Sequence, residues 1–191
     1  MADKKLSALT ELAATPAVDD ELYIRDVSEA PAAESKRITI ANLMAASGYT
    51  EGARAYHNVD QAIPNNTWTA VALNSELYDT DAIHDNVTNN SRLTCKTAGV
   101  YVITGHIDLE ESTTGLRSLF IRLNGTTYIA EYQSNNVEGG PGFSWITSIA
   151  TIYKLAVNDY VELMIRQTSG GSLDLKAYAS TSPHFAMQRI G

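Results

Sequence analysis

The stretch Ala98–Glu111, AGVYVITGHIDLEE, has the two-residue alternation of a long β-strand. One face of this strand carries large apolar side chains, which belong in a hydrophobic core: Tyr101, Ile103, Ile107 and Leu109. The opposite face carries small or apolar side chains where a half-exposed strand usually has Lys, Glu or Gln: Val100, Val102, Thr104 and His106. We therefore expect both faces of the strand to be covered, and the first question is what covers the second one.

Charge and hydropathy exclude several classes of partner. The chain has 191 residues, a net charge of −8 and a pI of about 4.9, and its 14 Lys and Arg residues form no basic stripe. Nucleic acid is therefore not an expected partner. No apolar run approaches the roughly 20 residues of a membrane span, so membrane insertion is not expected. Because the first residues lack the apolar centre of a signal peptide, we expect synthesis in a reducing cytoplasm.

Motifs for catalysis or metal binding are scarce in the sequence. Cys95 is the single cysteine, which rules out an intrachain disulfide, and its strand context favours a buried apolar role over a nucleophile. No nucleophile-elbow, phosphate-binding or dinucleotide-binding motif occurs. The four histidines lack metal-ligand spacing: His57, His84, His106 and His184. We therefore predict no enzyme activity, no cofactor and no metal.

The composition of the chain changes near Gly48. Residues 1–48 are rich in Ala and contain a short leucine stripe, two short strands around 22–27 and 38–40 that form a hairpin, and one or two helical turns before Gly48. So small a unit cannot bury a sufficient core alone. We expect a partner to complete its apolar side chains: Leu6, Leu9, Leu12, Leu22, Ile24, Ile38, Ile40 and Leu43.

From Arg54 onward the chain reads as about ten short strands separated by turn signals such as Asn124-Gly125. No amphipathic helix of ten residues follows Gly48, so we predict a mainly β fold of two sheets. The runs DYVELMIRQ and PHFAMQRIG also carry apolar or small residues on both faces. A neighbouring copy of the chain is the expected cover for the second faces, at Val100, Val102, Thr104, His106, Tyr160, Met164, His184 and Ala186.

Residues 53–191 resemble the globular head of complement C1q and its tumour-necrosis-factor (TNF)-like relatives. The resemblance rests on the polar loop, apolar strand and Gly-Val-Tyr block in Ser91–Ile107, on the Asn-Asp turn and strand in Asn158–Ile165, and on a final strand containing Phe185. Asn158 stands where the family usually has Gly, and Asn also tolerates a left-handed backbone. The resemblance implies a ten-stranded jelly roll that assembles as a homotrimer, with the Gly-Val-Tyr strand and the last strand on the inner sheet around the threefold axis. It places His106 and His184 near each other as hydrogen-bonded interface residues, in preference to a metal-binding ring.

Residues 1–48 resemble a module that begins phage tail-fibre and head-fibre proteins. The module has an acid-flanked strand, a Ser-rich loop, a Lys-Arg-Ile-Thr strand and an Asn-Leu that opens a short helix, here within ELYIRDVSEAPAAESKRITIANLMA. The resemblance implies that residues 1–48 anchor the chain to a virion.

Together these readings predict a bacteriophage virion structural protein, a trimeric head or tail fibre. Its N-terminus would bind a capsid or tail protein, and its C-terminal knob would be displayed on the virion surface and bind a host surface glycan or protein. A capsid decoration protein that stabilises the shell is an alternative, and a free glycan-binding adhesin or lectin is an alternative of another class. The candidate ligand loops contain Tyr78, Asp79, Asp81, Asp85, Tyr132, Asn135 and Asn136. The aspartates among them favour a solvated acidic loop over a calcium site, because their spacing is not that of an EF-hand.

Overall fold

The computed structural model describes residues 21–25, 35–39, 48, 50–135 and 144–191. The chain divides into two compact units, Met1–Gly48 and Tyr49–Gly191. Several residues of the predicted N-terminal unit lie outside the described residues, together with the predicted helical turns: Leu6, Leu9, Leu12, Val27, Ile40 and Leu43.

Two strands are described in the N-terminal unit. β1 (Glu21–Arg25) and β2 (Ser35–Thr39) pair in antiparallel fashion, with Leu22 opposite Ile38. The predicted strands and their pairing are confirmed.

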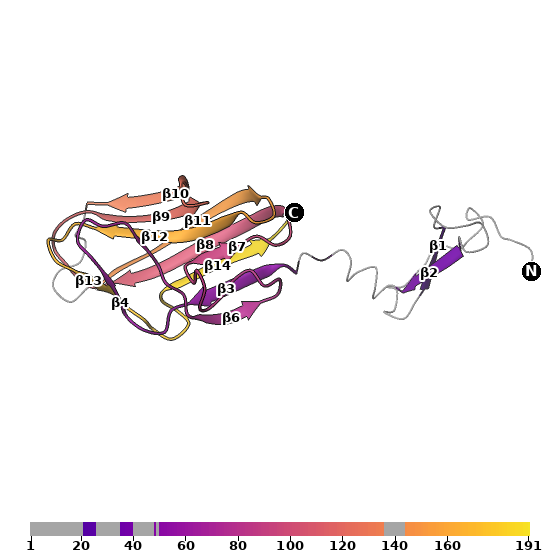
Figure 1. Ribbon diagram of the computed structural model, residues 1–191, viewed down its shortest axis with the longest axis horizontal. Coiled ribbons are helices and arrows are strands. Elements are labelled where there is room, and N and C mark those ends of the chain that lie inside the picture. Colours follow the sequence, from indigo (N-terminus) through magenta and orange to yellow (C-terminus); the bar gives the residue numbers. More distant parts are fainter. Residues whose placement is uncertain (1–20, 26–34, 40–47, 49, 136–143) are drawn as a thin grey trace, which may run out of the picture. The chain divides into compact units, whose positions relative to one another are not determined.

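The second unit is a sandwich of two antiparallel sheets (Figure 1). The seven-stranded sheet has the order β4-β13-β8-β14-β3-β6, with β11 paired to β8. Its strands are β3 (Gly52–Tyr56), β4 (Gln61–Ile63), β6 (Ser75–Asp79), β8 (Gly99–Leu109), β11 (Trp145–Leu155), β13 (Leu173–Leu175) and β14 (His184–Arg189). The five-stranded sheet has the order β10-β9-β12-β5, with β7 paired to β12. Its strands are β5 (Thr69–Ala70), β7 (Arg92–Thr94), β9 (Arg117–Leu123), β10 (Thr127–Ser134) and β12 (Tyr160–Gln167).

The core lies between the two sheets, and β8 contributes the face that the sequence predicts. Its four core residues are fully buried: Tyr101, Ile103, Ile107 and Leu109. On the same face, a Cβ atom at Gly105 would lie 2.6 Å from Leu163 Cδ1 of β12. This face of β8 therefore packs directly against the other sheet, and the predicted mainly β, two-sheet architecture is confirmed.

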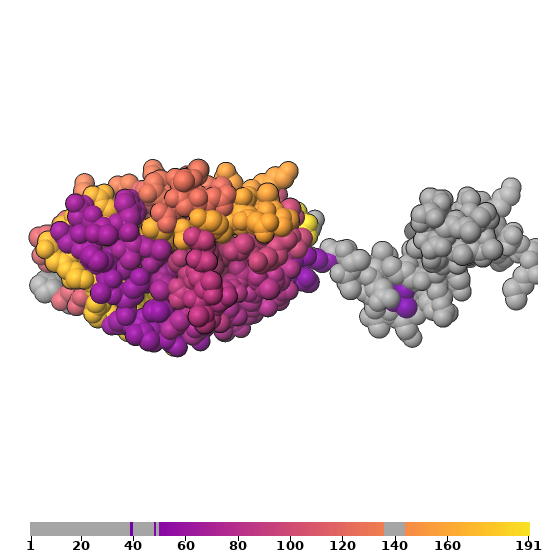
Figure 2. All heavy atoms as spheres, viewed as in Figure 1, coloured from indigo at the N-terminus to yellow at the C-terminus, as the bar shows by residue number. Residues whose placement is uncertain are grey.

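The connections follow the turn chemistry of the sequence. Asn124 and Gly125 join β9 to β10 with φ angles of 49° and 72°, as a tight hairpin requires. Asn158, before β12, has a φ of 72° and adopts the left-handed conformation expected of it. Strands from distant parts of the chain lie side by side, and the last strand, β14, runs between β3 and β8 (Figure 1). Figure 2 shows the result, a closely packed second unit whose visible surface mixes early and late segments.

Two strands, β4 and β6, were not expected from the sequence. Ser75–Asp79, which reads as part of a polar loop, forms β6 at the edge of the seven-stranded sheet and pairs with β3 through an irregularity at Arg54/Ala55. An edge strand is exposed to solvent, so its side chains need not alternate between apolar and polar. Thr69–Ala70 is a strand of only two residues, β5. Val71 and Leu73 are still fully buried there, and the Val71 amide donates to the Leu163 carbonyl at 2.9 Å.

Candidate functional site

The second face of β8 belongs to a broad surface, which we call the open face. It is the face of β11, β8, β14 and β3 that points away from the five-stranded sheet. Cross-strand pairing arranges its side chains in rows. The first row is Ser148, His106, His184 and Tyr56; the second is Ala150, Thr104, Ala186 and Arg54; the third is Ile152, Val102 and Gln188.

The open face is poor in charge and rich in small or apolar side chains. Ile146 and Ile152 of β11 are 62% and 64% exposed. Among the described residues of these four strands, the charged side chains on this face are Arg54 and Lys154 at its margins and Asp108, which is buried. A contiguous surface of this kind is typical of a protein–protein interface.

His106 and His184 lie next to each other at the centre of the open face. They are cross-strand partners on β8 and β14, with stacked rings whose centroids are 5.4 Å apart. The His106 Nδ1 lies 2.9 Å from the Ser148 Oγ. The predicted proximity of the two histidines is confirmed.

The surroundings of His184 favour its neutral form. Its Nδ1 lies 2.7 Å from the Thr181 carbonyl oxygen, which can only accept, so this nitrogen carries the proton and Nε2 is left as the acceptor. Burial lowers the pKa of His184, and the nearby Arg54 and His106 lower it further, against the opposing effect of the Thr181 carbonyl. The guanidinium of Arg54 contributes because its Nη2 lies 3.4 Å from the His184 Nδ1.

Tyr160 and Met164 do not lie on the open face, although the sequence groups them with its residues. Both belong to β12 in the five-stranded sheet. Met164 is only 2% exposed and is the cross-strand partner of Phe120. The ring centroids of Phe120 and Trp68 are 4.6 Å apart. The second face of β12 is thus covered by side chains of the same chain, and the prediction that another copy covers it is corrected for these two positions.

A buried carboxylate completes the second face of β12. Glu162 is 4% exposed, accepts from Arg122 Nη2 at 2.8 Å and from Ser91 Oγ at 3.0 Å, and lies 3.5 Å from Arg92 Nε. The Arg92 guanidinium also stacks 4.0 Å above the Tyr160 ring. These contacts join β12 to β7 and β9, so this charged cluster stabilises the sheet.

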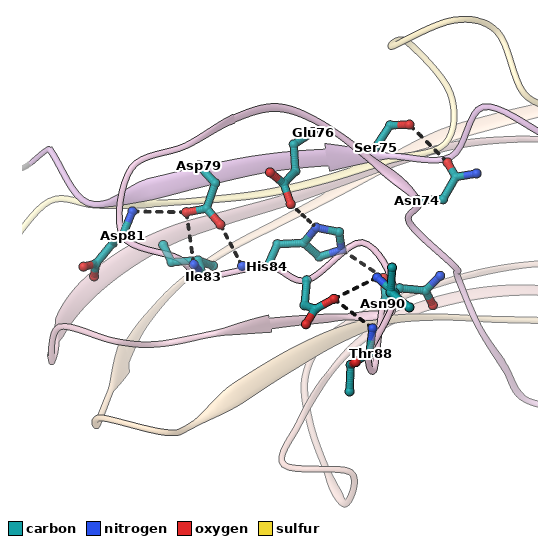
Figure 3. A network of polar contacts seen from close by, with 11 residues as sticks. Asn74, Ser75, Glu76, Asp79, Asp81, Ile83, His84, Thr88 and Asn90 are labelled. Carbon is teal, nitrogen blue, oxygen red and sulfur yellow. Dashed lines mark hydrogen bonds and ion pairs between the residues drawn. The ribbon is translucent and has the colours of Figure 1, made fainter.

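The predicted acidic loop uses its carboxylates to hold its own backbone (Figure 3). Asp79 accepts hydrogen bonds from the amides of Asp81, Ile83 and His84 at 2.9–3.1 Å. Asp85 accepts from the amides of Val87 and Thr88, both at 2.8 Å. The Thr88 amide, followed by that of Val87, holds the pKa of Asp85 below its usual value. The carboxylates therefore hold the backbone of the loop, while Asp85 and the residues up to Asn89 are exposed to solvent, as expected of a solvated acidic loop.

His84 bridges this loop to β6 and has a role that the sequence does not reveal. Its Nδ1 lies 2.9 Å from the Glu76 Oε1 and its Nε2 3.1 Å from the Asn90 carbonyl oxygen (Figure 3). Both partners are hydrogen-bond acceptors, one a carboxylate and one a backbone carbonyl. A hollow of about 360 Å³ lies beside this bridge, lined by Ala82, Ile83, His84, Asp85, Thr88, Asn89, Arg92, Thr94 and Lys96.

The two predicted ligand loops lie at different edges of the sandwich. Tyr78 is 40% exposed on β6, opposite Arg54 at the margin of the open face. Tyr132 is 44% exposed on β10, at the edge of the other sheet. Its ring stacks on that of Trp145, with the ring centroids 6.0 Å apart. Asn135 is exposed, and Asn136 lies outside the described residues. The structure therefore does not combine the two loops into one site.

Within the described part of the chain, no cluster of three or more His, Cys, Asp or Glu side chains is placed to hold a metal ion. Cys95 is fully buried, as predicted, and burial raises the pKa of its thiol. None of the described helices is both long and apolar enough to cross a membrane.

Comparisons with known proteins identify the fold. No protein-family model and no curated protein matches the chain. Among solved structures, the globular domain of zebrafish complement 1qA is 18% identical, with a TM-score of 0.53 over 74% of this chain and 98% of that one. Murine APRIL is 9% identical, with a TM-score of 0.55 over 73% and 98%. Eiger TNF from S. frugiperda is 12% identical, with a TM-score of 0.54 over 74% and 92%. These likenesses agree with the two-sheet topology, and the second unit has a C1q/TNF-like jelly-roll fold.

Proposed function

We propose that the protein is a non-enzymatic, homotrimeric structural component of a bacteriophage virion. Residues 1–48 attach it to a capsid or tail protein, and the jelly roll is displayed as a knob on the virion surface. The observation that carries the proposal is the open face. A sheet face with exposed Ile146 and Ile152 and few charges is stabilised when another copy of the chain covers it.

The fold supports a threefold arrangement of the copies. The resemblance to C1q and TNF heads supports an arrangement in which β8 and β14 surround the trimer axis, and these strands form the centre of the open face. We assign the interface to Val100, Val102, Thr104, His106, His184 and Ala186, together with the exposed side chains of β11. Tyr160 and Met164 are left out, because they lie on the other sheet.

The proposed attachment to a virion rests on the N-terminal unit. Its sequence resembles phage fibre modules, and the antiparallel pair β1–β2 is the arrangement expected of such a module. Within the virion class, the protein is a head or tail fibre whose knob binds the host surface, or a decoration protein that stabilises the capsid.

A charge placed on the open face tests the trimer. Val102 lies between Ile152 and Gln188 in the third row of the open face. We expect Val102→Asp to dissociate the trimer, because an unpaired charge buried in an interface costs several kcal/mol. Val87→Asp is the matched control, since Val87 is 86% exposed. Native mass spectrometry of both variants decides the question, and a wild-type monomer with intact strand content would contradict the proposal.

Deletion of residues 1–48 tests the attachment. We expect the truncated protein to remain trimeric and to be lost from purified particles, because its proposed contact with the virion has been removed. Electron microscopy and gel analysis of particles measure its occupancy. Normal occupancy of the truncated protein would place the anchor in the knob, and the proposed orientation would then be wrong.

A free glycan-binding adhesin is the second candidate function. It is supported by the exposed Tyr132, whose ring stacks on Trp145 and offers a flat aromatic surface. Microscopy of particles separates the two candidates, because an adhesin of this kind would be absent from them.

A further inference from the structure

We infer that His106 and His184 make the association between copies sensitive to acid, so that the trimer is stable at neutral and alkaline pH and dissociates when these imidazoles are protonated. The inference rests on the proposed trimer and adds a means of regulating it.

The geometry places both imidazoles on the surface that another copy would cover. The two rings stack with their centroids 5.4 Å apart, on the two central strands of the open face. Both side chains are half-buried within one chain, so an opposing copy would remove much of their remaining contact with water. Burial of a charged imidazolium without a counter-ion is unfavourable.

The neighbouring groups do not offset a positive charge on both rings. Arg54 of β3 is already charged and reaches His184, while Tyr56 of β3 and Ser148 of β11 are neutral neighbours in the same row. Asp108 lies two residues along β8 on the same face, and its Oδ1 is buried without a hydrogen-bond partner among the described residues. The positive charge of Arg54 balances this single carboxylate, so no net negative charge remains for two imidazolium groups.

The sign of the pH dependence follows from His184. Its pKa is lowered in the folded chain, chiefly by burial, from an ordinary value of 6.5. A histidine that the folded state keeps neutral contributes its full stabilisation of that state above the unfolded pKa. This contribution is lost as the pH falls below that value. The effect is repeated in each copy of the trimer, so it acts at three symmetry-related positions.

The net charge of the chain predicts the opposite trend. At pH 7 the formal charge is −8, and the pI is about 4.9. Acidification toward pH 5.5 therefore reduces the general repulsion between copies, which favours association. Dissociation at this pH must then come from local groups at the interface.

The test measures the oligomeric state of the full chain by native mass spectrometry and light scattering at pH 8.0 and pH 5.5. We expect a trimer at pH 8.0 and, at pH 5.5, a dissociation constant about tenfold higher or more, because an imidazole that binds a proton in the free chain must release it when another copy covers it. Circular dichroism should show that strand content is retained at both values. The variant His106→Gln/His184→Gln should remain trimeric at both. His57→Gln is the matched control and should keep the acid response, since His57 is not part of the open-face rows.

The outcomes separate this inference from the proposed trimer. A monomer at pH 8.0 overturns the trimer and the acid response together. A wild-type trimer that is equally stable at both pH values overturns the acid response alone, as does dissociation that persists in the double variant. If the double variant does not fold, His106→Gln alone should weaken the response, and an unchanged response would contradict the inference.

Discussion

At the scale of single residues, the contact between the two sheets depends on the absence of a side chain. Gly105 lies in the middle of β8 and faces Leu163 of the opposite sheet, with Ile149 of β11 beside it. A Cβ atom there would lie 2.6 Å and 3.0 Å from the two terminal carbons of Leu163. Leu163 is fully buried, so it has little room to move.

We predict that Gly105→Ala destabilises the protein by about 1–3 kcal/mol, which is the usual cost of overpacking a core. Urea unfolding measures the change in the free energy of unfolding. Gly171→Ala is the matched control, because a Cβ atom at Gly171 meets no other atom within 4 Å. Equal stability of the two variants would show that the core adapts to the additional methyl group.

At the scale of elements, β8 and β12 differ in what lies against their second faces. Both strands carry side chains on two faces that need cover. On β12 the cover comes from the same chain, through the aromatic contacts of Trp68 and the arginines around Glu162. On β8 no such cover is present among the described residues, and the exposed isoleucines of the adjacent β11 enlarge the surface.

We predict that Glu162→Ala lowers the free energy of unfolding by about 2–4 kcal/mol, because two partly buried arginines lose their counter-ion. The Arg122 and Arg92 side chains retain 23% and 35% exposure, which limits the cost. Thermal and urea unfolding measure the effect. Lys176→Ala removes ion pairs to Asp60 and Asp174 at the surface and should leave the stability near that of the wild type. A larger loss for Lys176→Ala than for Glu162→Ala would contradict this ranking.

At the scale of the whole molecule, the jelly roll has a complete core of its own. Its buried apolar residues all come from positions 53–187. Residues just before β3 still contribute contacts, since the Thr50 carbonyl accepts from Thr80 and the Glu51 carbonyl from the Arg189 amide.

We predict that the fragment 49–191 folds cooperatively and assembles like the full chain, because it retains both the core and the open face. Differential scanning calorimetry should give one transition at the same temperature as the transition of this unit in the full chain. The shorter fragment 52–191, which lacks Thr50 and Glu51, should melt at a lower temperature. Aggregation of the fragment 49–191 would show that its stability depends on the preceding residues.

The sequence predicts those features that depend on local chemistry. Alternation in residues 100–109 identifies the core face of β8, and the positive φ of Asn124 and Asn158 follows from residues that tolerate this backbone. The pairing of β1 with β2 also follows from two apolar strands separated by a polar segment. The strand β6 is missed, because an edge strand lacks a clear alternation.

The sequence by itself determined that the chain forms a mainly β fold with a break near Gly48, and that β8 lacks the Lys, Glu and Gln side chains typical of a half-exposed strand, because these properties depend on residues close together in the chain. The tertiary structure decided which second faces the chain covers itself. Trp68, Phe120 and Met164 come together from separate strands of one sheet, while His106 and His184 meet at an uncovered face of the other. It also decided that Asp79 and His84 order their own loop. These outcomes depend on which distant strands become neighbours, and side-chain alternation along one strand does not contain that information.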